Sequence, residues 1–109
     1  MTLGDFIGTN TFTLVNDGGN HDVEISGLYC CDLLSIAMGN APEACMWVTV
    51  MNNINTLAVA ALAECGCIVL ACNVAPDEAF IAKAKEQNIT VFSTELPVFD
   101  AALLAHNCL

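Results

Sequence analysis

The stretches CMWVTVM at residues 45–51 and CIVLAC at residues 67–72 are the strongest indication of the fold in this sequence. Both are continuously apolar apart from Thr49, as expected of strands that are buried on both faces of a parallel sheet. An Ala-rich helix is predicted between them at 53–64, and a second helix opens at Pro76. A third buried strand follows at 89–92 and a last helix at 97–106. This alternation predicts an α/β layered domain with a mainly parallel sheet flanked by helices.

The first third of the chain is divided by turns into shorter elements. The sequence predicts a short helix at 2–7, a strand at 11–15, an alternating strand at 23–30 and a helix at 33–38. No linker, charge run or repeat divides the chain further. We therefore expect residues 1–109 to form a single domain.

The charge of the chain limits its partners. Of the 109 residues, 12 are acidic and 2 are basic, which gives a net charge of −10 and leaves no arginine. Nucleic-acid binding needs Lys and Arg to displace counterions from phosphates, and an anionic membrane surface attracts the same side chains. We expect neither partner. The longest apolar stretch, 57–72, is interrupted by Glu64 and is shorter than the roughly 20 residues of a membrane span.

The seven cysteines are predicted to be free thiols. Their odd number, the apolar core and an N-terminus without a signal peptide favour a cytoplasmic protein over a secreted disulfide framework. Cys67 and Cys72 lie five residues apart on one predicted strand, so their side chains face opposite sides of the sheet. We therefore expect no metal site and no cofactor. Nothing in the spacing of His and Lys relative to the cysteines indicates an activated nucleophile, which disfavours a cysteine enzyme.

Polar side chains gather where the predicted strands end, at the edge where open parallel sheets bind ligands. The candidate ligand-binding residues are Asp32, Asn52, Asn53, Asn55, Thr56, Ser93 and Thr94. Asn, Ser and Thr at such junctions also serve as helix caps and turn residues, so a purely structural role is the alternative. With two lysines in the chain, a small anionic or nucleotide-like ligand would be held by backbone N–H groups and a helix N-terminus. We expect that site at the start of the 53–64 helix, beside Ser93 and Thr94 and with Asp32 close by.

Several segments resemble the stand-alone members of the DRTGG domain family. They are GLYCCDLLS at 27–35, AMG at 37–39, WVTVMNNIN at 47–55, APDE at 75–78, AKAK at 82–85 and VFST at 91–94. The resemblance covers about residues 3–105 and implies a fold similar to the N-terminal domain of HPr kinase/phosphorylase. Related copies lie inside phosphate acetyltransferases and between the CBS domains of some inorganic pyrophosphatases, in regulatory or structural roles. This chain has Asn52-Asn53 where many members carry an Asp-Arg pair, and it lacks the kinase P-loop domain.

The resemblance implies a non-enzymatic regulatory or small-ligand-sensing domain associated with redox or energy metabolism. The alternative is a structural protein-interaction module that docks on a larger metabolic or hydrogenase-type complex, with a protein partner covering apolar surface. The sequence contains no Gly-rich phosphate loop and no G-x-S-x-G motif, so no catalytic residues are predicted. The helix at 53–64 is apolar on nearly every side and should be buried on every side, which predicts a homodimer unless a neighbouring helix covers it.

Overall fold

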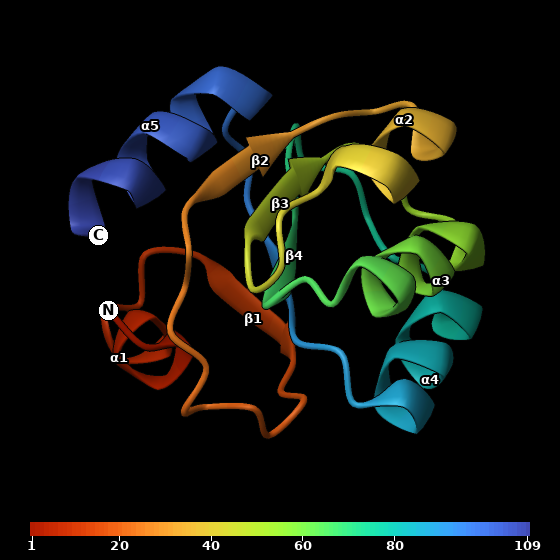
Figure 1. Ribbon diagram of the computed structural model, residues 1–109, viewed down its shortest axis with the longest axis horizontal. Coiled ribbons are helices and arrows are strands. Elements are labelled where there is room, and N and C mark those ends of the chain that lie inside the picture. The colour runs from red at the N-terminus through yellow and green to blue at the C-terminus, as the bar shows by residue number, and fades with distance from the viewer.

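A five-stranded sheet with the strand order β1-β5-β4-β3-β2 runs through the centre of the computed structural model, which describes residues 1–109 (Figure 1). The strands are β1 (Thr13–Asn16), β2 (Leu28–Cys30), β3 (Met46–Thr49), β4 (Cys67–Leu70) and β5 (Val91–Ser93). Strands β2 to β5 are parallel, with Met46 opposite Cys67 and Ile68 opposite Val91. The predicted parallel pairing of the three central strands, and with it the fold class, is confirmed.

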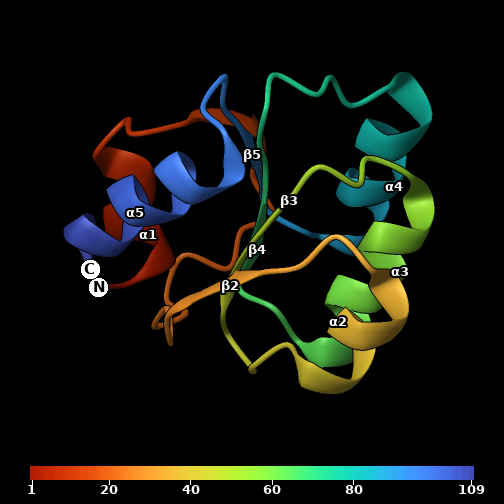
Figure 2. The same ribbon diagram turned by 90° about the horizontal axis from the view of Figure 1, so that it is seen from above.

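Five helices cover the two faces of the sheet. They are α1 (Leu3–Gly8), α2 (Leu34–Asn40), α3 (Ile54–Ala63), α4 (Glu78–Gln87) and α5 (Val98–Cys108). Figure 2 shows α1 and α5 on one face and α2, α3 and α4 on the other. The side chains of Asn53 and Asp77 cap α3 and α4, and both helices end at a residue in the left-handed conformation, Glu64 and Asn88 respectively. None of the helices combines the length and the apolar character that a membrane crossing requires.

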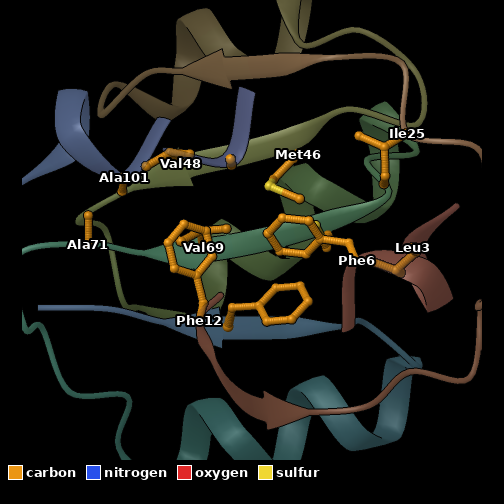
Figure 3. Packing of buried hydrophobic residues seen from close by; sticks show 12 residues of the cluster. Leu3, Phe6, Phe12, Ile25, Met46, Val48, Val69, Ala71 and Ala101 are labelled. Carbon is orange, nitrogen blue, oxygen red and sulfur yellow. The ribbon is translucent and has the colours of Figure 1, made fainter. Parts of the chain in front are cut away.

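The central strands alternate their side chains between two apolar clusters. Cys67 and Val69 of β4 pack toward α1 and α5, and Ile68 and Leu70 pack toward α3 and α4. The first cluster holds three phenylalanines whose ring centroids lie 5.4–6.3 Å apart, and Figure 3 shows Phe6 and Phe12 of this cluster together with Met46 and Val69. Burial on both faces explains why β3 and β4 are apolar at nearly every position.

The structure differs from the sequence predictions at three strands. β1 lies antiparallel to β5 at the edge of the sheet, a pairing that the sequence did not indicate. The strand predicted at 23–30 is reduced to β2, with one isolated bridge between Thr2 and Glu24. The strand predicted at 67–72 ends at Leu70, because Cys72 and Asn73 have the positive φ of a left-handed turn. Cys72 is therefore exposed and lies outside the strand, so the argument about its strand face does not apply.

Candidate functional site at the carboxyl edge of the sheet

The carboxyl ends of β2, β3, β4 and β5 meet at one edge of the sheet, which we call the carboxyl edge. Asp32 follows β2 there, and its Oδ1 accepts hydrogen bonds from Thr49 Oγ1 at 2.8 Å and from the N–H of Val50 at 3.0 Å. The Thr49 hydroxyl is fully buried and accepts from the N–H of Met51 at 3.2 Å. Asp32 thus fixes the beginning of the loop between β3 and α3.

Four of the predicted residues lie together at the junction of β3 and α3. Asn53 Oδ1 accepts from the N–H of Asn55 at 2.9 Å, which makes it the N-cap of α3. Thr56 is fully buried and donates to a carbonyl of the same loop at 2.8 Å. Asn52 reaches the next loop, where its Nδ2 donates to the carbonyl of Ala75 at 2.8 Å. The side chain of Asn55 is exposed at the start of the helix.

A cavity of about 260 Å³ opens at the carboxyl edge between the β4–α4 loop and the end of β5. Its polar lining consists of Thr13, Asn73, Ser93, Thr94 and Glu95. The N–H of Asn73 donates to the carbonyl of Thr94 at 2.9 Å, so backbone hydrogen bonding fixes one wall. A second hollow, of about 580 Å³, shares Ser93, Thr94 and Glu95 and continues along β1. Ser93 and Thr94 therefore lie at the centre of the hollowed part of this edge.

The predicted residues fall into two groups on this edge. The first group follows β2 and β3 and comprises Asp32, Asn52, Asn53, Asn55 and Thr56; the second follows β5 and comprises Ser93 and Thr94. Strand β4 and its loop to α4 lie between them, because β4 separates β3 from β5 in the sheet. The hydrogen bond from Asn52 to Ala75 links the groups, since Ala75 also lines the cavity.

Three polar residues of the cavity were not among the sequence candidates. Asn73 follows β4 just as Asn52 follows β3, so its position after a buried strand was a usable signal. Glu95 directly follows Thr94 and was available by the same reasoning. Thr13 belongs to β1, whose antiparallel pairing places the beginning of this strand at the carboxyl ends of the others. Only the pairing of β1 with β5 places Thr13 at the carboxyl edge.

The electrostatics of the cavity differ from those of a typical phosphate site. Glu95 is the charged side chain in its lining, and neither lysine of the chain contributes to it. Lys83 and Lys85 lie in the second half of α4, a helix that begins near this edge and runs away from it. Amides, hydroxyls and backbone groups are thus the available partners for a ligand in the cavity. No cluster of three or more His, Cys, Asp or Glu side chains is arranged to hold a metal ion.

Comparison with known proteins identifies the fold. No family model and no curated protein matches the sequence. The structure is similar to that of the CBS and DRTGG domains of the regulatory region of Clostridium perfringens pyrophosphatase, complexed with the activator diadenosine tetraphosphate. The similarity has a TM-score of 0.79 at 17% sequence identity and covers 99% of this chain and 47% of that one. The two chains share a fold, and this chain spans about half the length of its structural neighbour.

Proposed function

We propose that residues 1–109 form a single DRTGG-like regulatory domain that binds a small nucleotide-like ligand at the carboxyl edge and catalyses no reaction. The observation that carries the proposal is the polar cavity at this edge, within a fold shared over 99% of the chain with a regulatory region. That regulatory region binds diadenosine tetraphosphate, which makes this nucleotide the first ligand to test. The DRTGG-like segments of the sequence support the same function, and an association with redox or energy metabolism rests on them alone.

The two groups of polar residues would hold different parts of such a ligand. The hydroxyls of Ser93 and Thr94 and the amide of Asn73 offer hydrogen bonds to a base or sugar in the cavity. A phosphate would bind away from Glu95, at the N-terminus of α3, where Asn53 and Asn55 lie and the helix dipole is positive. Asp32 and Thr56 would fix the junction through the hydrogen bonds already described. The link from Asn52 to the wall of the cavity joins the two parts.

Thermal denaturation with diadenosine tetraphosphate, ATP and adenosine tests this function. A ligand present at 100 times its Kd stabilises the folded state by about 2.7 kcal/mol. Asn73→Gly removes the amide but tolerates the left-handed backbone, so it should weaken binding without unfolding the protein. Ser35→Ala, on the exposed side of α2, is the matched control. An unchanged melting temperature with all three compounds at millimolar concentration would show that the proposal is wrong.

We further propose that the domain is a homodimer through the outer face of α3. This helix packs between α2 and α4 (Figure 2). Its residues Ile54 and Leu62 are nevertheless 52% and 70% exposed. Ala58 and Ala61 lie between them on the exposed side and leave room for a second copy of the helix to approach. Leu62→Glu should therefore shift a dimer to a monomer in sedimentation equilibrium. A wild-type monomer at micromolar concentration would rule the dimer out.

A protein-interaction module is the second candidate function, and the exposed apolar side chains of two helices favour it. Phe99 is 71% exposed, and Leu103 and Leu104 accompany it on α5; Leu33 and Ile36 are exposed around α2. Such a module would dock on a larger metabolic or hydrogenase-type complex through these side chains. No nucleotide would then stabilise the domain, and Phe99→Ser would abolish capture of the partner. Stabilisation by a nucleotide, with capture unaffected by Phe99→Ser, would decide for the ligand-binding function.

A further inference from the structure

Two cysteines meet at the amino ends of β3 and β4, at the edge opposite the cavity. Cys45 directly precedes β3, and Cys65 lies two residues before β4. Their Sγ atoms are 3.6 Å apart, with the Cys45 thiol donating to Cys65. Cys45 is only 1% exposed, whereas Cys65 is partly exposed. One thiol of the pair thus belongs to the core and the other faces solvent.

The backbone holds the two cysteines in this position. The N–H of Ala44 donates to the carbonyl of Glu64, and the N–H of Gly66 donates to the carbonyl of Cys45, both at 2.8 Å. A Cβ atom on Gly66 would lie 2.8 Å from Ile25 Cδ1 and 3.0 Å from the carbonyl oxygen of Ala44. Glycine is therefore required for the two segments to approach so closely. The register of β3 and β4, and not side-chain mobility, brings the sulfurs together.

A cavity of about 250 Å³ gives access to Cys65. It lies between the end of α3 and the end of α4, and Ala61 and Asn88 line it together with Cys65. Cys67 also contributes to the lining, but it is 1% exposed and packs into the cluster on the other face of the sheet. Cys45 lies behind Cys65 in the core. A small reagent that enters the cavity therefore reaches Cys65 first.

The pKa values of the two thiols also differ. The hydrogen bond from Cys45 lowers the pKa of Cys65, although burial acts in the opposite direction. The same hydrogen bond, together with burial, raises the pKa of Cys45 far above its ordinary value. Burial also raises the pKa values of Cys67 and Cys30. Of the two thiols, Cys65 is thus the one that ionises more readily, and the thiolate is the reactive form of a cysteine.

We propose that Cys65 and Cys45 form an oxidisable dithiol, in which the Cys65 sulfur attacks small hydroperoxides and Cys45 then closes a disulfide with it. This inference is independent of the function proposed for the carboxyl edge. It uses a thiol as the activating neighbour of Cys65, a partner that the sequence did not indicate.

The reaction proceeds in two balanced steps. The Cys65 thiolate attacks one oxygen of the hydroperoxide, the O–O bond breaks, and the departing alkoxide or hydroxide takes a proton from solvent. Cys65 is then a sulfenic acid. The Cys45 sulfur attacks the Cys65 sulfur, the S–O bond breaks, and the hydroxyl leaves with the Cys45 proton as water. Two thiols are oxidised to one disulfide, the hydroperoxide is reduced to water and an alcohol or a second water, and a thiol reductant reverses the change.

Peptide mapping of the full chain after hydrogen peroxide treatment tests the proposal. Free thiols are blocked with iodoacetamide, and a Glu-specific protease then cleaves after Glu43, Glu64 and Glu78 to release peptides 44–64 and 65–78. We expect these peptides to be joined by a bond that dithiothreitol breaks, and fragmentation to assign it to Cys45 and Cys65. Oxidation of Cys65 to a sulfinic acid without this bond would overturn the proposal. So would a bond to Cys72 in its place.

Single variants then separate the roles of the two sulfurs. In Cys45→Ala the bond is lost and dimedone labels Cys65. In the wild type, iodoacetamide should alkylate Cys65 faster than Cys30 at neutral pH, and Cys45→Ala should remove this difference in rate. In Cys65→Ala neither the bond nor a label at Cys45 forms. Cys30→Ala, at the opposite end of the sheet, is the matched control and leaves the bond intact. Dimedone labelling of Cys45 in the Cys65→Ala variant would contradict the assigned roles, and the wild-type peptide map decides the pairing even if a variant fails to fold.

Discussion

Replacing Asn53 by alanine and by aspartate separates its role as a helix cap from a role in ligand binding. Its Oδ1 accepts the N–H of Asn55 at 2.9 Å, and alanine removes this acceptor. The expected loss is about 1 kcal/mol of the free energy of unfolding. Aspartate keeps the acceptor and adds a negative charge at the positive end of the α3 dipole, so Asn53→Asp should match the wild type to within a few tenths of a kcal/mol.

The two variants should differ in the opposite sense in ligand affinity. If a phosphate of ATP binds at the N-terminus of α3, the new carboxylate lies beside it. Two unit charges about 4 Å apart repel by roughly 1 kcal/mol in water and about 4 kcal/mol near a protein surface. Asn53→Asp should therefore weaken binding by between about fivefold and about a thousandfold, since about 1.4 kcal/mol is tenfold in Kd. Asn53→Ala adds no charge and should have the smaller effect.

The assays are urea denaturation, followed by the fluorescence of Trp47, and calorimetric titration with ATP. Trp47 is the one tryptophan of the chain and is fully buried, so its emission reports the core. The affinity should also rise when salt is added from very low ionic strength, because the net charge of −10 repels the ligand and the screening length falls to about 8 Å at 0.15 M. An unchanged affinity in Asn53→Asp would place the phosphate elsewhere. A loss of stability in Asn53→Asp equal to that in Asn53→Ala would refute the capping argument.

Three further predictions concern stability. A Cβ atom on Gly18 would lie 2.4 Å from the carbonyl oxygen of Asn88, so Gly18→Ala should cost about 1–3 kcal/mol in urea denaturation, whereas Gly8→Ala, with open space around it, should not. Hydrogen bonds from the N–H of Gly19 and from the His21 side chain lower the pKa of Asp17. The stability that Asp17 contributes is therefore present above pH 3.8 and is lost as the pH falls through the lowered pKa. Asp17→Asn should make the loss of stability with acid less steep, and an equally steep loss in acid titration would contradict this. Trp47→Phe removes the donor that the partly buried carbonyl of Cys31 has at 2.9 Å and should cost about 1 kcal/mol. A change below the error of thermal denaturation would contradict this.

The central sheet could be predicted from the sequence because burial on both faces leaves a specific pattern. β3 and β4 are apolar at nearly every position, and each is followed by a segment with the length and caps of a helix. The edge strand β1 has no such pattern. Its pairing depends on tertiary contacts, such as the hydrogen bond from Asn16 Nδ2 to the carbonyl of Ile89 at 2.8 Å. A buried asparagine that bonds to a carbonyl 73 residues away leaves no signal in the local sequence.

The two candidate sites differ in how far the sequence anticipated them. The carboxyl edge follows from a rule about strand ends, so most of its polar residues could be named before the strand order was known. The cysteine pair follows from register, which the sequence does not give. The pairing of Met46 with Cys67 brings Cys45 next to the residues just before β4, and a shift by one residue would move Cys45 to the other face. From the spacing in the sequence, Cys67 and Cys72 are the pair to consider instead.

Strands β3 and β4 run from the cysteine pair at one edge of the sheet to the carboxyl edge at the other. Cys45 and Cys65 precede β3 and β4, and Asn52 and Asn73 of the carboxyl edge follow these strands. Four strand residues at about 3.3 Å each, roughly 13 Å in all, therefore separate the two edges. The backbone turns next to the sulfurs, where Ala44 and Glu64 have positive φ, whereas the strands between the edges are fully paired and buried. Closing a disulfide from 3.6 Å to about 2.05 Å would therefore be absorbed by these turns before it could displace the strands. On this geometry the proposed dithiol and the proposed ligand site lie at opposite edges of one sheet, and we expect a change at one to leave the other in place.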